Sequence, residues 1–157
     1  MSNDNTPKTH VYIPVKSPCI GVCSTGIGDS VCRGCKRFSH EIIYWNGYNE
    51  PERQAVAQRL QYLLSQAVKA KITVVDVEQL RAALDFQKIH YHPDANQECW
   101  VFALLKAGAT QIEDPSHYGC ELTSDYQDYD MRRLRDEIDS DFYTLSSVHY
   151  ERYFHRH

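Results

Sequence analysis

The sequence predicts a mainly α-helical protein in which a small four-cysteine module is followed by a short helix, a long amphipathic helix and a helical C-terminal extension. Apolar residues recur every three or four positions over 50–69 and again over 129–153, which is the period of an amphipathic helix. Four of the six cysteines lie between residues 19 and 35, a stretch with too few apolar residues to build a core alone. A bound metal would hold such a stretch together. We expect at most a minor β contribution.

Composition divides the chain into three parts. Residues 1–16 have no helical period and are expected to form a flexible lead, residues 17–69 form the four-cysteine metal-binding module with its helices, and residues 70–157 form an acidic, mainly helical region. Lys and Arg number seven against five Asp and Glu up to residue 66, and ten against sixteen after it. This balance argues against a general nucleic-acid binder, which needs a concentrated positive face, but it leaves a local contact open.

Capping residues mark the helices of the module. Ser39 is expected to cap a short helix over 40–46. The helix over 50–69 has a stronger start signal, because Asn49 at the N-cap is followed three residues later by Glu52, which is the capping-box pattern.

The C-terminal region carries weaker signals before its last helix. A short β-rich piece over 70–75 precedes a helix over 77–89, for which Asp76 is the expected cap. The apolar run 99–105 is predicted to be either a buried strand or a buried helix, because periodicity alone does not separate the two. Residues 109–124 are predicted to form a loop with a short strand.

The cysteine spacing is that of two close pairs joined by a short polar loop with glycines. Cys19, Cys23, Cys32 and Cys35 follow the pattern C-x3-C-x8-C-x2-C. Each pair could bind one metal from one side, as a tetrahedral thiolate site requires. Zinc suits four thiolates, and an iron–sulfur cluster also takes four cysteines, so the spacing leaves the metal open.

Cellular context supports ligands over disulfides. No apolar run has the length of a signal peptide or of a membrane span, so we expect a cytoplasmic protein. In that reducing compartment clustered cysteines are metal ligands more often than disulfide partners.

Residues around the cysteines occur at characteristic offsets: Ser17-Pro-Cys-Ile-Gly-Val-Cys23, Cys32-Arg-Gly-Cys35-Lys-Arg37, Glu41-Ile42, Trp45 and Glu52-Arg53. This combination resembles the small bacterial YdhL-like family, a domain of unknown function described as a predicted iron–sulfur protein. The resemblance covers residues 17–66 and implies an iron–sulfur cluster on the four cysteines. The sequence departs from the usual family pattern at Phe38, His40 and Tyr48, where threonine, an acid and methionine are usual.

Basic residues lie between and just after the last two cysteines. Arg33, Lys36 and Arg37 could contact a partner protein or a nucleic-acid backbone. They could equally form a solvated basic rim that offsets the negative charge of four thiolates.

A second metal site is a weaker alternative. It would draw on the remaining scattered ligand-type residues, whose spacing is irregular: His90, His92, Cys99, His117 and Cys120. We expect one metal site only.

Motifs for nucleotide binding, nucleophilic catalysis and zinc proteolysis are absent from the sequence, so an enzyme is not indicated. We expect a cytoplasmic metal-binding accessory protein whose four-cysteine site is an iron–sulfur centre for electron transfer or redox sensing. Its partner would be another protein, with no membrane contact and no small-molecule substrate. The alternative is a structural zinc module that mediates protein or RNA contact.

Overall fold

The computed structural model describes residues 15–154. The expected lead, 1–16, therefore lies outside the described residues except for its last two. The described part is mainly α-helical with one small sheet, as predicted. Its helices and strands are α1 (Ser39–Tyr44), α2 (Glu50–Lys69), β1 (Ile72–Val74), α3 (Val77–Phe86), α4 (Gln97–Gly108), β2 (Cys120–Leu122) and α5 (Met131–Tyr153). Short 3-10 turns lie between them: η1 (Ser24–Ile27), η2 (Trp45–Gly47), η3 (Ala109–Gln111), η4 (Pro115–Tyr118) and η5 (Ser124–Tyr126).

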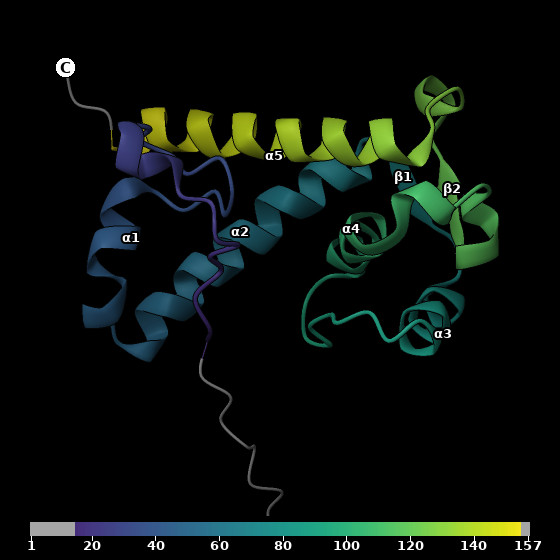
Figure 1. The fold of residues 1–157 in the computed structure, drawn as a ribbon, viewed down its shortest axis with the longest axis horizontal. Coiled ribbons are helices and arrows are strands. Elements are labelled where there is room, and N and C mark those ends of the chain that lie inside the picture. The colour runs from purple at the N-terminus through teal and green to yellow at the C-terminus, as the bar shows by residue number, and fades with distance from the viewer. Residues whose placement is uncertain (1–14, 155–157) are drawn as a thin grey trace, which may run out of the picture.

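The two long helices organise the molecule. Figure 1 shows α5 lying across the top, from the β1–β2 sheet near its start to the cysteine-bearing loops near its end, with α2 running diagonally beneath it. Both helices turn apolar side chains toward each other and toward α4, which is the amphipathic packing that their period predicts. Their buried apolar residues are Val56, Leu60, Leu63, Ala67 and Val68 on α2, and Met131, Leu134, Ile138 and Phe142 on α5.

The start of α2 is set by the predicted capping box. The Asn49 side chain accepts a hydrogen bond from the Glu52 backbone over 2.9 Å, and the Glu52 side chain accepts one from the Asn49 backbone over 3.1 Å. Two backbone N–H groups at the helix start are thereby satisfied. The predicted bounds 50–69 agree with the structure.

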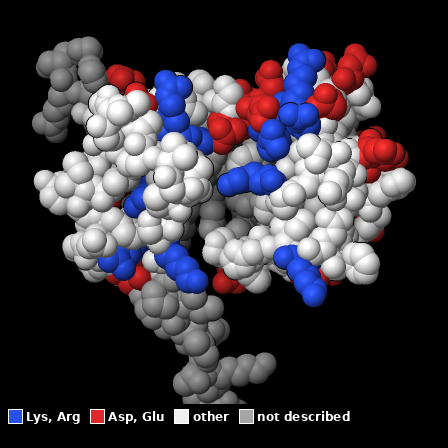
Figure 2. Space-filling view, in the orientation of Figure 1, with Lys and Arg blue, Asp and Glu red and all other residues white. Residues whose placement is uncertain are grey.

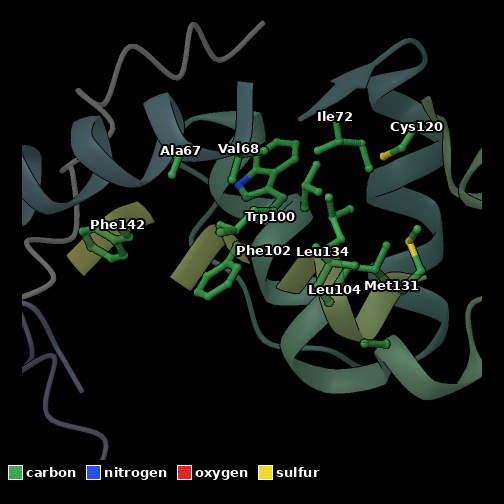
Figure 3. Close-up of a cluster of buried hydrophobic side chains, with 14 of the residues drawn as sticks. Ala67, Val68, Ile72, Trp100, Phe102, Leu104, Cys120, Met131, Leu134 and Phe142 are labelled. Carbon is green, nitrogen blue, oxygen red and sulfur yellow. The ribbon is translucent and has the colours of Figure 1, made fainter. Parts of the chain in front are cut away.

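The apolar run 99–105 is helical, which resolves the strand-or-helix alternative. It lies within α4, which contacts α2, α3, α5 and β1, so most of its circumference is covered. Trp100 and Leu104 are 4% and 3% exposed. Figure 3 shows both within the cluster of buried side chains. A helix covered on several sides is apolar around its axis, so the run lacks the periodicity that would have identified it.

The sheet is limited to one antiparallel pair of short strands. Ile72 of β1 pairs with Leu122 of β2, and Val74 pairs with Cys120. β1 falls inside the β-rich piece predicted over 70–75, and β2 falls inside 109–124, where a loop with a short strand was predicted. The sheet joins the chain after α2 to the chain before α5, and so it fixes where α5 starts.

Two helix ends differ from the prediction. The helix expected over 77–89 ends at Phe86, because Lys88 adopts a left-handed backbone with φ 57° and turns the chain. The short helix α1 begins at Ser39 itself and not at His40, with Phe38 at the cap position; the Phe38 N–H is satisfied by the Glu41 carboxylate over 2.8 Å.

Within residues 15–154 no helix has the combined length and apolar character needed to cross a membrane.

Candidate metal centre

The second cysteine pair lies in a tight hairpin. The backbone N–H of Lys36 bonds to the carbonyl oxygen of Cys32 over 2.8 Å, and the N–H of Cys32 bonds to the carbonyl of Arg37 over 2.9 Å. Lys36 closes the turn in the left-handed region, at φ 66°, which is uncommon for a residue with a side chain. The hairpin brings Cys32 and Cys35 to one end of the loop.

The first cysteine pair lies on a segment that packs against this hairpin. A side-chain carbon on Gly34 would come within 2.7 Å of the Val22 carbonyl oxygen, so only glycine allows this approach. The Ser24 hydroxyl accepts a hydrogen bond from the Arg33 backbone over 2.8 Å. Val22 and Ser24 flank Cys23, so both neighbours of that cysteine contact the hairpin that carries the second pair.

The Cys32 thiol is buried and has a lowered pKa. Burial raises the pKa of the Cys32 thiol, but hydrogen bonds from the backbone N–H groups of Cys35, Ser24 and Gly34, together with one from the Cys35 side chain, lower that pKa to about 7. The Cys32 side chain also lies 3.5 Å from the Val22 carbonyl oxygen. At neutral pH a large fraction of this buried thiol would be thiolate, the form that binds metals.

Cys35 has a different environment. Burial raises the pKa of its thiol, and Arg37 opposes the increase by donating a hydrogen bond from Nε to the Cys35 sulfur over 3.3 Å. Arg37 is itself only 3% exposed and lies over the Trp45 ring at 4.9 Å. A buried guanidinium next to the sulfur would stabilise a thiolate there.

Cys19 and Cys23 are exposed, and each makes only local contacts. The Cys19 sulfur accepts a hydrogen bond from the Gly21 backbone over 3.4 Å, and the Cys23 sulfur lies 2.9 Å from the Thr25 hydroxyl. All six cysteines have free thiols. In the described part of the chain no three Cys, His, Asp or Glu side chains are arranged as a ready metal-binding group. The structure thus brings the two cysteine-bearing turns together, but not all four sulfurs.

The three basic residues, which are close in sequence, have three different environments. Arg33 is exposed and pairs with Asp29 over 3.2 Å. Lys36 is 2% exposed and donates to Asp139 of α5, while Arg37 is buried against Trp45. The three residues therefore do not form a common solvated basic rim. Of the three side chains expected to contact a partner, Arg33 alone is accessible in this conformation.

Sequence reasoning missed the ion pair that supports the hairpin. Glu41 is buried and receives two hydrogen bonds of 2.6 Å from the Arg59 guanidinium of α2. The same carboxylate accepts the Phe38 N–H, so it links the end of the hairpin to α1 and α2. The acid in the first turn of α1 was visible in the sequence, but its partner lies 18 residues away and no local pattern pairs them.

The residues considered for a second metal site do not form one cluster in the described part of the chain: the rings of His90 and His92 lie 5.3 Å apart, but no group of three ligand-type side chains is formed. Cys99 is on α4 and donates to the Gln61 carbonyl, and Cys120 is buried in β2. Burial raises the pKa of both thiols to about 11. His117 is exposed beside Asp114. A buried thiol that stays protonated behaves as a small apolar core residue.

Comparison with known proteins locates the similarity in the N-terminal part of the chain. A family model described as protein of unknown function (DUF1289) matches residues 17–63. The uncharacterized protein YdhL of Escherichia coli (strain K12) is 34% identical over 59 residues, which are 38% of this chain and 73% of YdhL, and YdhL of Shigella flexneri gives the same figures. YdhL of Escherichia coli O6:H1 is 40% identical over 45 residues, 29% of this chain and 56% of that protein. No solved structure matches the chain.

The matched segment contains all four clustered cysteines, the hairpin, α1 and most of α2, and it ends before β1. Helices α3, α4 and α5 lie beyond it. Through residues 17–63 the chain belongs to the DUF1289 family.

Proposed function

We propose that Cys19, Cys23, Cys32 and Cys35 bind one metal centre and that the protein acts as a metal-binding accessory protein in the cytoplasm. The observation that carries the proposal is the position of the Cys32 sulfur, which is buried where the two cysteine-bearing turns meet and donates to the Val22 carbonyl oxygen of the first turn over 3.5 Å. The desolvation of a buried thiolate is costly unless a cation or hydrogen bonds offset it. A metal ion supplies the missing positive charge.

The donor set fits a thiolate-ligated metal. Cys32 and Cys35 share one hairpin, and Cys19 and Cys23 lie on the segment that packs against it, so a four-sulfur site would form by movement of the two exposed cysteines toward the hairpin. These residues are on loops and not inside long helices, so this adjustment leaves the core unchanged. The resemblance to a predicted iron–sulfur family favours an iron–sulfur cluster, which would supply one-electron chemistry for electron transfer or redox sensing.

The protein groups around the site have defined roles in this proposal. Arg37 donates to the Cys35 sulfur, and hydrogen bonds of this kind raise the reduction potential of a sulfur-ligated centre. Lys36 holds the hairpin to α5 through Asp139. The site is thereby attached to the helix that spans the molecule.

A structural zinc ion is the second candidate. The hairpin that Lys36 closes in the left-handed region favours this candidate. Two short cysteine-bearing turns held together by one ion are typical of structural zinc sites. Four cysteine ligands would leave no position for a catalytic water. In this case the site would hold the N-terminal module in shape for contact with another protein, with Arg33 as the accessible basic residue near it.

Anaerobic purification followed by visible absorption and metal analysis tests the proposal. Iron with acid-labile sulfide and visible absorption bands would identify a cluster, whereas a colourless protein with one zinc per chain would identify the structural site. Cys32→Ser is expected to lose the metal, while Cys99→Ser, a change of the same type at a thiol outside the site, is expected to retain it. Equal metal content in the two variants, or no bound metal in the unmodified protein, would refute the proposal.

A further inference from the structure

An open groove runs between the cysteine hairpin and α4. Its volume is about 1260 Å³. Leu60, Leu64 and Phe142, which are buried or half-buried, form its floor, and Ala103 and Ala107 of α4 also line it. Figure 2 shows this face hollowed between the part that carries α1 and the part that carries α4, with lysine and arginine side chains along the edge.

The charge of the groove is opposite to that of the chain. Among the described residues that line it are four Lys and Arg, namely Arg33, Lys36, Lys88 and Lys106, against one acid, Asp139. Lys36 is paired with Asp139, and Arg33 with Asp29, which does not line the groove, so Lys88 and Lys106 carry the rest of its positive charge. The chain as a whole has a net charge of −4. The local positive charge is therefore a property of this site and not of the composition.

The positive charge lies at the rim, and the floor is apolar. Lys88 and Lys106 are exposed on the α3–α4 loop and on α4, while Arg33 is exposed on the hairpin across from them. Cations on both edges of an apolar floor are complementary to a ligand with apolar groups on one side and carboxylates along its flanks.

From this arrangement we propose that the groove binds an acidic amphipathic segment of a partner protein. Apolar side chains of the segment would lie on Leu60, Leu64 and Ala107, and its carboxylates would reach Lys88 and Lys106. The volume exceeds the range of about 300–1,000 Å³ that is usual for small-molecule pockets, and the groove is open along its length, which suits a peptide.

A nucleic acid fits the groove less well. Sequence-independent binding of single strands depends on aromatic rings whose faces are open for base stacking. Trp100 and Phe102, which line the groove, are 4% and 7% exposed. Tyr91 is half-buried with its ring 5.2 Å from that of Trp100, and the rings of His90 and His92 pack against each other at 5.3 Å, so few of the lining rings have open faces. Aliphatic side chains form the floor instead.

The groove ends at Cys35, which is one of its lining residues. A docked segment would therefore lie next to the hairpin that carries the proposed metal site. The binding proposal rests on the shape and charge of the groove alone, so it stands or falls independently of which metal, if any, the cysteines hold.

Fluorescence anisotropy with a designed probe tests the inference on the full chain. The probe is a labelled helical peptide of about 14 residues with leucine at helical i, i+3, i+4 and i+7 spacing and glutamate at the remaining positions. Its controls are the same peptide with lysine in place of glutamate, and a labelled poly(U) RNA. We expect saturable binding of the acidic peptide, weakening as salt is raised, and no saturable binding of the two controls.

Two sets of variants locate the binding. Charge reversal at the rim, Lys88→Glu with Lys106→Glu, is expected to weaken binding by about tenfold or more, whereas the matched pair Lys16→Glu with Lys69→Glu, which is exposed outside the groove, leaves it unchanged. Ala107→Phe fills the groove and is expected to weaken binding, in contrast to Ala55→Phe at an exposed position on α2. Far-ultraviolet circular dichroism confirms that each variant remains folded.

Several outcomes would overturn the proposal. Binding unaffected by both the rim reversal and Ala107→Phe would place the peptide elsewhere. Preferential binding of the lysine peptide or of RNA would contradict the assigned chemistry of the ligand. A concentration-dependent dimer that the acidic peptide fails to displace, and that the rim reversal dissociates, would show that a second copy of the chain occupies the groove.

Discussion

Lys36 donates a hydrogen bond from its buried Nζ atom to the Asp139 carboxylate over 2.5 Å, and this pair joins the cysteine hairpin to the middle of α5. The Lys36 side chain is 2% exposed, while the Asp139 side chain is half exposed. The same ammonium bonds to the Gly34 carbonyl over 3.1 Å and lies 5.4 Å from the centre of the Phe142 ring. The residue that closes the hairpin is thus also the residue that anchors it.

Removal of the Asp139 charge tests how much this anchor contributes. Asp139→Asn leaves a buried ammonium without its counter-ion, so we expect the free energy of unfolding to fall by about 1–3 kcal/mol, less than for a fully buried pair because water reaches Asp139. Urea denaturation measures the change. Asp136→Asn is the control, because Asp136 is exposed and pairs only with neighbouring Arg135. Equal stability of the two variants would show that the anchor is unimportant.

Phe38 makes the second connection between the hairpin and α5. It is fully buried, with its ring 5.2 Å from those of Tyr150 and Phe154 and with the Arg59 guanidinium 4.0 Å from its centre. The matched segment ends at residue 63, so α5 lies beyond it. Phe38 therefore connects the matched segment to a helix outside it.

Phe38→Ala is therefore expected to cost about 3–5 kcal/mol of unfolding free energy, the range for a large buried aromatic residue. Phe86→Ala, at the exposed end of α3, should change stability by no more than about 0.5 kcal/mol. Guanidinium denaturation compares the two. A small loss at Phe38 would mean that the α5 terminus does not pack on the hairpin in solution.

Local signals in the sequence predicted the elements whose boundaries are set locally. The capping pair Asn49 and Glu52 fixed the start of α2, and the apolar period predicted α5 to within two residues. Capping depends on side chains within one helical turn, so sequence spacing suffices. The type of α4 depends instead on neighbours that cover it on several sides, and those neighbours cannot be read from its own residues.

Only part of the candidate site was predicted, because only part of it depends on residues close together in the sequence. The cysteine spacing identified the two pairs, because chelation by a hairpin is local. Lys36 and Asp139 are 103 residues apart in the sequence. The residues near Lys36 in the sequence therefore do not indicate that it is buried while Arg33 remains exposed. The four cysteines as ligands, the identity of the metal and the domain boundary near residue 69 remain predictions.

The Glu41–Arg59 pair provides a third test of the module. Glu41→Gln keeps the size of the side chain but removes its charge, which leaves the Arg59 guanidinium partly buried without a counter-ion. We expect a loss of about 3 kcal/mol in the free energy of unfolding. The control is Glu52→Gln on exposed α2 surface, which keeps an acceptor for the Asn49 N–H and should cost about 0.5 kcal/mol or less. A Glu41→Gln variant as stable as this control would contradict a structural role for the pair.

Buried thiols predict how stability depends on pH in the alkaline range. Burial raises the pKa of Cys120 from its ordinary value of 9.0 to about 11. The folded chain therefore keeps a proton that the unfolded chain loses, and stability falls as pH rises from 9 toward 11 while being unaffected below 9. For this one thiol the slope approaches about 1.4 kcal/mol per pH unit.

Cys120→Ala should make the decline of unfolding free energy between about pH 9 and 10 shallower, whatever it does to stability near pH 7. The comparison stops at about pH 10 so that Lys71 does not contribute to the slope. Burial lowers the pKa of Lys71, but Asp141 and Tyr126 outweigh burial and raise that pKa above its ordinary value of 10.5. The stability that Lys71 contributes is therefore lost only above pH 10.5. Ser65→Ala replaces a buried side chain that does not ionise, and it should shift stability at every pH without changing the slope. Urea titrations at about pH 7, 9 and 10 measure the free energy of unfolding of the unmodified chain and of the two variants. Parallel pH slopes for Cys120→Ala and the unmodified chain would show that Cys120 is not buried as a neutral thiol.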